Sequence, residues 1–132
     1  MLQALWSLEV LLAEGAVPAG VLIFHLRRVF GDYYQTGRLF GGDTRSHYVG
    51  EYQIENLGLT GRFTAIRHGG VDPTPFGEKD RHDITFTGAL EANLERDVLI
   101  LDAAIDCATD RAADGDGARP IQLRLTKRAP LA

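Results

Sequence analysis

The stretch "ITFTGALEANL", Ile84–Leu94, decides the fold class, because apolar residues recur in it at every second position. An extended chain would carry on one side Ile84, Phe86, Gly88, Leu90, Ala92 and Leu94. The polar residues Thr85, Thr87, Glu91 and Asn93 would lie on the other side. Successive side chains of a strand point to opposite faces, so this period indicates a strand with one face toward a core.

The same alternation recurs along most of the chain. Apolar residues occupy the even positions from Leu2 to Leu12, which favours a strand over the short helix that the leucines also suit. Later strands are expected over 99–107 and 121–128, and two more over 48–68, joined by a hairpin at Glu55-Asn56. Gly15 and Pro18 are expected to form a turn.

These segments amount to seven to nine short strands, and no stretch combines helical length with helix caps. A succession of strands without crossover helices implies antiparallel pairing in a sandwich or a barrel. Closure removes exposed sheet edges. We therefore predict an all-β protein, a small antiparallel up-and-down β-barrel of about eight strands, as one domain over residues 1–132.

The motif "GGD", Gly41, Gly42 and Asp43, invites three catalytic readings. A cyclase-type hairpin would need a second acidic residue, yet Thr44 and Arg45 follow. A phosphate loop would need a Lys-Ser/Thr pair before a helix, and a metal site would need further ligands. A structural turn is the better interpretation, with glycines in unusual backbone conformations and Asp43 bonded to nearby amides.

Several motifs occur in a familiar order. They are "ALW" near the start, "AGVLIF", "GRLFGGD", the spaced Tyr48, Gly50 and Tyr52, and "LTGRFTAIRH". In this order the chain resembles the GrlR-like family, which is named for a negative regulator of type III secretion. The best agreement covers Gly37–His68, and a weaker one extends over nearly the whole chain.

The resemblance implies a lipocalin-like barrel that dimerises and regulates through protein contact, with no catalytic residue to carry over. The acidic run associated with the secretion regulator is absent here, and only Glu51 and Glu55 stand at the comparable place. The partner of that regulator is therefore not expected for this chain. The interval from Ile23 to Gly37 is also longer than expected, which indicates an extended hairpin.

The interior of an eight-stranded barrel either fills with side chains or holds one small ligand. Trp6, Phe63 and Phe86 would fill it, whereas small residues such as Gly61 and Ala65 would leave an apolar cavity. His82 is expected on the inward side by its parity with Ile84 and Phe86, and His25 and Arg67 are candidates for the barrel mouth. Together these three would orient a carboxylate ligand or remain satisfied or solvated. Both alternatives stay open.

Two sets of residues are candidates for a dimer or partner interface. One is the run Val21, Leu22, Ile23 and Phe24, which is apolar on both faces of a strand. The other is the aromatic group Tyr33, Tyr34, Tyr48 and Tyr52. Aromatic residues on strands usually stabilise cross-strand pairs, and they also serve as interface anchors.

Composition narrows the function further. The formal charge of −4 argues against a nucleic-acid binder. His47 and His68 are far apart in the sequence, and the single Cys107 suits a core, so neither a metal nor a cofactor is expected. No apolar run spans a membrane and Glu9 interrupts a would-be signal peptide, which favours a cytoplasmic location.

These observations predict a non-enzymatic binding or regulatory protein that forms a homodimer and contacts another protein. The alternative is a carrier of a small apolar ligand, such as a fatty acid, inside the barrel. An enzyme is least favoured, since it would need polar side chains converging in a cavity.

Overall fold

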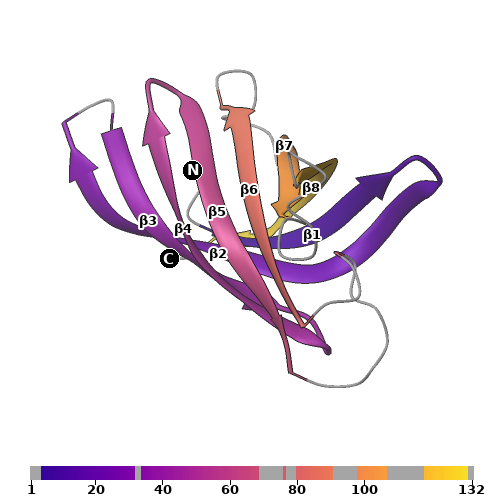
Figure 1. Cartoon of the computed structure of the whole chain (residues 1–132). Coiled ribbons are helices and arrows are strands. Elements are labelled where there is room, and N and C mark those ends of the chain that lie inside the picture. Colours follow the sequence, from indigo (N-terminus) through magenta and orange to yellow (C-terminus); the bar gives the residue numbers. More distant parts are fainter. Residues whose placement is uncertain are drawn as a thin grey trace.

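The chain folds into eight antiparallel strands that close into a barrel (Figure 1). The computed structural model describes residues 4–31, 34–68, 76, 80–90, 98–106 and 118–130. The strands are β1 (Ala4–Leu12), β2 (Gly15–Phe30), β3 (Tyr34–Gly42), β4 (Ser46–Glu55), β5 (Gly58–Arg67), β6 (Arg81–Ala89), β7 (Val98–Asp106) and β8 (Ala118–Pro130). Each strand pairs with the next and β1 pairs with β8, so the predicted up-and-down barrel is confirmed.

Alternation in the sequence becomes alternation of burial. In β1 the residues Ala4, Trp6, Leu8 and Val10 are buried, which decides for a strand rather than a helix there. In β6 the inward residues are His82, Ile84 and Phe86. Leu90 is buried just beyond the end of β6, whereas Ala92, Leu94 and Cys107 lie outside the described residues.

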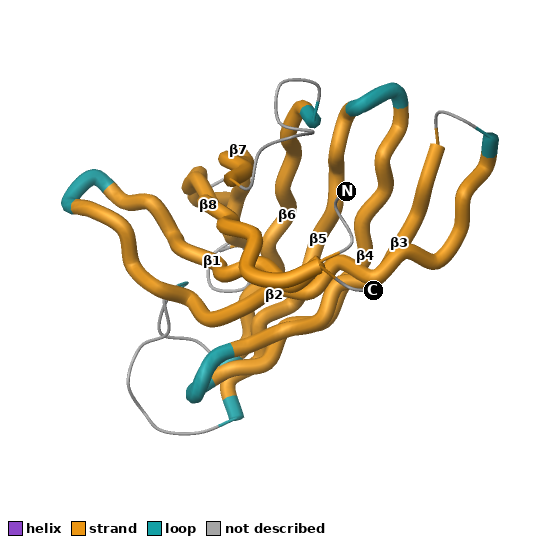
Figure 2. The backbone as a smooth tube through the Cα atoms, turned by 180° about the vertical axis from the view of Figure 1, so that it is seen from behind, coloured by secondary structure: helices purple, strands orange, loops and turns teal. Residues whose placement is uncertain are grey.

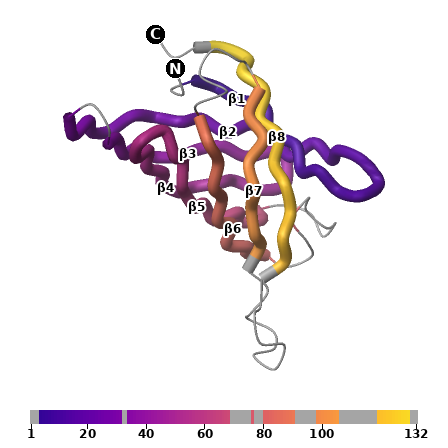
Figure 3. The backbone as a smooth tube through the Cα atoms, turned by 90° about the horizontal axis from the view of Figure 1, so that it is seen from above, coloured from indigo at the N-terminus to yellow at the C-terminus, as the bar shows by residue number. Residues whose placement is uncertain are grey.

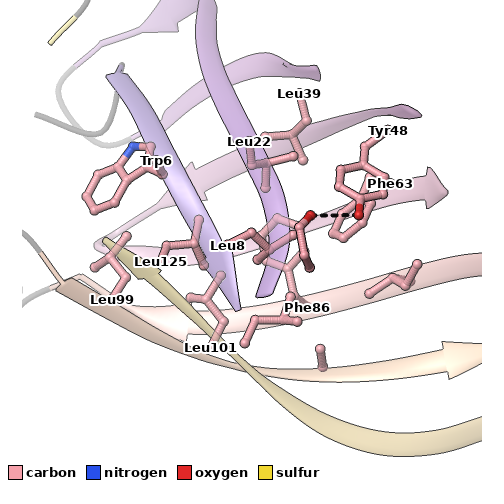
Figure 4. Close-up of a cluster of buried hydrophobic side chains, with 14 of the residues drawn as sticks. Trp6, Leu8, Leu22, Leu39, Tyr48, Phe63, Phe86, Leu99, Leu101 and Leu125 are labelled. Atoms are coloured by element: carbon pink, nitrogen blue, oxygen red, sulfur yellow. Dashed lines mark hydrogen bonds between the residues drawn. The ribbon is translucent and has the colours of Figure 1, made fainter. Parts of the chain in front are cut away.

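Aromatic side chains from several strands lie in the barrel interior, among them Trp6, Tyr48, Phe63 and Phe86 (Figure 4). The ring centroids of Trp6 and Phe24 lie 6.4 Å apart, and those of Phe24 and Phe86 lie 6.5 Å apart. The ring centroid of Phe63 lies 6.2 Å from that of Phe86 and 5.4 Å from that of Tyr48. These edge-on and tilted contacts are the arrangement that aromatic quadrupoles prefer. Trp6, Phe63 and Phe86 thus belong to one packed core.

Strand β2 is longer than the sequence pattern indicates. It includes Pro18, so the expected turn at Pro18 is wrong. Pro18 lies within β2 opposite Glu9, where the β1–β2 register shifts. The β2–β3 ladder starts only at Val21, so Pro18 faces no described strand on that side. A missing N–H costs nothing on such an edge. The β1–β2 hairpin therefore projects from the barrel, as Figures 2 and 3 show.

The expected hairpin at Glu55-Asn56 joins β4 to β5 and is confirmed. Glu55 pairs with Gly58, which leaves a two-residue turn of Asn56 and Leu57. Both have positive φ, 51° and 69°, as a type I′ turn requires. Asparagine tolerates this conformation well, whereas leucine does not, so Leu57 is held there by the ladder on either side.

Candidate functional site

A hollow of about 760 Å³ lies on the outside of the barrel, over β3, β4, β5 and β6. We call it the outer groove. These strands lie side by side in Figure 1. The groove is lined mainly by outward residues of these strands, together with Arg27 of β2 and Ala104 of β7, and at Gly50 it reaches the buried Leu39 and Phe63.

Strand register sorts the lining into two neighbouring rows. In the apolar row, Phe40 pairs with Val49, and Val49 pairs with Thr64. In the charged row, Arg38 pairs with Glu51, and Glu51 pairs with Arg62. Residues paired across strands project from the same face, so each row crosses the sheet as a stripe.

The apolar row is open to solvent. Phe40 is 40% exposed and Val49 is 44% exposed, although both lie in the middle of a sheet. Val21, on the neighbouring β2, is 37% exposed and extends the apolar surface. Contiguous exposed apolar side chains, rimmed by polar ones, mark interaction sites more often than isolated ones do.

Arg27 of β2 lies on the rim of the outer groove, next to a β-bulge. It shares the outward parity of His25, so alternation alone places it on this face. The β2–β3 register then skips Arg27 between Leu26 and Arg28. A bulge re-aims the residues that follow it, and Arg28 accordingly lines one small hollow together with Arg27 and Thr36. Arg27 contributes a positive charge to the rim of the groove.

Charges in the outer groove are only partly compensated. Arg62 lies 3.7 Å from Glu51, and Arg81 lies 3.9 Å from Asp83, which also accepts a hydrogen bond from Thr64 at 2.8 Å. Arg27 and Arg38 have no hydrogen bond or ion pair with the residues that the structure describes. Two guanidinium groups are therefore available to an anionic partner.

A second hollow of about 420 Å³ adjoins the outer groove and shares Arg27, Glu51 and Arg62 with it. Its lining includes Tyr52 and the two glycines that pair with it on either side, Gly37 and Gly61. A Cβ on either glycine would collide with an aromatic ring, that of Tyr52 or Phe86. Burial raises the pKa of the Tyr52 phenol to about 12.

The prediction that His82 points inward, by its parity with Ile84 and Phe86, is confirmed by its burial. Arg67, a candidate for the barrel mouth, lies at the end of β5 and forms an ion pair with Asp80 at 2.6 Å. His25, by contrast, is exposed on the outer side of β2, where it pairs with Arg38. The prediction that His25 lies at the barrel mouth is therefore wrong, because His25 lies on the outer face of the sheet.

The apolar run in β2 is divided between the two faces of the sheet. Val21 and Ile23 point outward, whereas Leu22 and Phe24 are fully buried in the core. The expectation of a surface role is corrected for Leu22 and Phe24. The run is apolar on both faces because its outward half belongs to the exposed apolar surface.

The tyrosine group is divided in the same way. Tyr48 and Tyr52 belong to the core, so they are also corrected as surface residues, while Tyr33 lies outside the described residues. The Tyr48 hydroxyl donates a hydrogen bond of 2.7 Å to the Ala19 carbonyl (dashed line in Figure 4), and burial raises its pKa. Tyr34 is half-buried and packs against Phe30 with ring centroids 5.4 Å apart.

Of the predicted turn residues only Asp43 lies in the turn from β3 into β4, because Gly41 and Gly42 are the last two residues of β3. The Asp43 carboxylate accepts hydrogen bonds from the amides of Arg45 and Ser46, at 2.8 and 2.9 Å. Gly42 has a φ of 151°, and a Cβ there would collide with the Ser46 carbonyl. A Cβ on Gly41 would collide with the Val21 carbonyl. The motif has a geometric role in bringing these backbones together.

His47 and His68, which are far apart in the sequence, are neighbours in space. Their rings stack with centroids 5.6 Å apart, because β4 and β5 are adjacent and antiparallel. Within the described ranges, no group of three or more histidine, cysteine, aspartate or glutamate side chains is placed to hold a metal ion. None of the described segments is a helix of the length and apolarity needed to cross a membrane.

The alternation in the sequence does not identify the outer groove. Alternation assigns Arg38, Phe40, Val49 and Arg62 to the outer face, but it does not say which of them meet across strands. Pairing the outward positions of β3 and β4 around the turn at Asp43 would have brought Phe40 onto Val49. Comparisons of this chain with family models, curated proteins and solved structures give no match.

Proposed function

We propose that this protein is a non-enzymatic binding and regulatory protein that contacts another protein through the outer groove. The observation that carries the proposal is the exposed pair Phe40–Val49 in the middle of a sheet. Burying such side chains against a partner releases roughly 25 cal/mol for each Å² of apolar surface. Aromatic residues at the centre of an apolar patch are frequent binding anchors.

Two further observations support protein contact. Trp6, Phe63 and Phe86 are packed in the core, and the outer groove is a hollow on the opposite face of the sheet. The resemblance of Gly37–His68 to the GrlR-like family, which rests on motif order alone, also favours regulation through protein contact. A second copy of this chain is one partner that the proposal includes.

Site-specific photo-crosslinking tests the proposal. Val49 is replaced by p-benzoylphenylalanine in the producing cells, which are then irradiated. A discrete protein adduct is expected, because the probe would lie inside the contact. Ile100 of β7 provides a matched control position, since it points outward with 45% exposure against 44% for Val49. Mass spectrometry identifies the adduct.

The outcome at the two positions decides the proposal. An adduct from position 49 that is absent from position 100 supports the outer groove as a protein interface. An adduct of twice the chain mass identifies a homodimer. Equal labelling from both positions, or a chain that stays unlinked from position 49, contradicts the proposal.

One observation favours the second candidate, a carrier of a small ligand inside the barrel. The Ser46 hydroxyl is buried and has no hydrogen-bond partner in the part of the chain that the structure describes. It lies at the end of the barrel that also holds Arg67 and Asp80. Native mass spectrometry of freshly purified protein tests this candidate. A bound fatty acid would favour the carrier, and a bare chain that also fails to bind a fluorescent lipid would exclude it.

A further inference from the structure

We infer that the outer groove receives an acidic segment of the partner protein, whose carboxylates meet Arg27 and Arg38 and whose apolar side chains cover Phe40 and Val49. This inference rests on the proposed function and names the chemistry of the partner.

The local charge of the groove is opposite to that of the chain. The lining holds four arginines and two carboxylates, a net +2, whereas the whole chain carries −4. Arginines that lie close together repel one another, so a positively charged groove on a negatively charged chain needs an explanation. Complementary charge on a partner supplies it, and also guides the two surfaces to the correct encounter.

The two arginines without described partners set the polarity of the contact. Glu51 offsets the charge of Arg62, and Asp83 offsets the charge of Arg81. Arg27 and Arg38 remain on the β2–β3 side of the groove. A guanidinium fork binds a carboxylate through two parallel hydrogen bonds, which makes arginine well suited to this contact.

Apolar and cationic positions are spaced like the side chains of an extended peptide. Arg38 and Phe40 are two residues apart on β3 and point to the same side. That separation is about 7 Å, the distance between alternate side chains of any strand. An extended segment lying along β3, with an acidic and an apolar residue at alternate positions of one face, would satisfy both.

Nucleic acid is the competing occupant of an arginine-rich groove, and the lining disfavours it. Glu51 lies between Arg38 and Arg62 in the charged row, and Asp83 lies at the end of the apolar row. Both carboxylates would repel a phosphate backbone, and so would the overall charge of −4. A peptide can place a polar or basic residue beside Glu51, which a uniform polyanion cannot.

Fluorescence anisotropy with synthetic peptides tests the inference. The probe is a labelled peptide in which pairs of glutamate alternate with pairs of phenylalanine. One comparison peptide replaces each glutamate by lysine, another replaces each phenylalanine by glycine, and an oligothymidylate of similar length represents nucleic acid. The acidic apolar peptide is expected to bind at least tenfold more tightly than each of the other three, and more weakly as salt rises.

Charge reversal in the groove provides the decisive comparison. The double variant Arg27→Glu/Arg38→Glu is expected to lose at least tenfold in affinity, and Arg27→Lys/Arg38→Lys should lose less. Arg128→Glu, on the exposed end of β8, is the control and should bind like the unmodified chain. Circular dichroism and an unfolding curve establish that each variant is folded.

Each remaining outcome counts against the inference. Preference for the lysine peptide or for oligothymidylate, equal binding by the charge-reversed variant, or no binding of any probe would overturn it. The photo-crosslinking at position 49 separates this failure from failure of the proposed function. A protein adduct that persists in Arg27→Glu/Arg38→Glu would leave protein contact standing and remove the acidic partner.

Discussion

The inner and outer faces of β3, β4 and β5 differ in what their side chains contact, although they alternate along the same strands. Inward, Leu39, Tyr48 and Phe63 are almost completely buried. Outward, Phe40, Val49 and Arg62 are exposed to solvent, Phe40 pairs with Val49, and Arg62 pairs with Glu51. The inner face therefore holds the barrel together, whereas the outer face is open to a partner. Substitutions on the two faces should separate stability from binding.

The largest difference in stability is expected between two phenylalanines. Phe63→Ala should lower the free energy of unfolding by about 3–5 kcal/mol, because it leaves a cavity among Tyr48, Phe76 and Phe86. Phe40→Ala, on the outer face, should change it by only about 0.5 kcal/mol. Urea titration followed by tryptophan fluorescence of Trp6 measures both. Equal losses would mean that the outer face is also part of a core.

Removing a buried hydroxyl should have the next largest effect. Tyr48→Phe deletes the donor to the Ala19 carbonyl, and a buried acceptor left unpaired costs about 1–3 kcal/mol. Tyr34→Phe is the matched control, since its hydroxyl bonds to the exposed Gln53 at 3.1 Å and water can replace it. The same urea titration compares them. A loss in Tyr34→Phe as large as that in Tyr48→Phe would contradict the assignment of faces.

Alkaline pH should weaken the inner face selectively. The pKa of Tyr52 rises from 10.0 to about 12 in the folded chain, so the unfolded chain loses this proton first. The stabilising contribution is complete below pH 10 and is lost as pH rises toward 12. Tyr52→Phe should therefore flatten the fall of the unfolding free energy across this range. An unchanged slope would show that the ring ionises freely in the folded barrel.

The smallest stability change concerns the turn between β4 and β5, outside both faces. Leu57→Gly should raise the free energy of unfolding by about 1 kcal/mol, because glycine adopts the positive φ of 69° without strain. Leu57→Ala is the control, since it shortens the side chain but keeps the strain. Thermal unfolding distinguishes the two variants. A gain in Leu57→Ala equal to that in Leu57→Gly would place the strain in the exposed side chain instead of the backbone.

Sequence alone predicts the inner face well, because burial follows a period that each strand displays by itself. Leu8, Phe63 and Ile84 are all identified in that way. The outer groove depends on which outward residues meet across strands, and that is a property of register. Register is set by turns and bulges, such as the skipped Arg27, and a single strand carries no sign of them.

Two misplacements have the same origin. The prediction of His25 at the mouth is wrong because the β2–β3 ladder decides which face His25 lies on. In that ladder His25 pairs with the outward Arg38. Pro18 was expected in a turn, since a proline seldom lies within a strand, but an edge that faces no described strand tolerates it. In both cases the neighbouring strand, rather than the local sequence, determined the outcome.

The most direct test is the free energy of unfolding of the double variant Phe40→Thr/Val49→Thr. Threonine keeps the preference for strands but removes most of the exposed apolar surface. If the outer groove serves a partner and not the fold, urea titration will give a value within about 1 kcal/mol of the unmodified chain. A loss as large as that of Phe63→Ala would contradict this account, since the pair would then be part of what holds the barrel together.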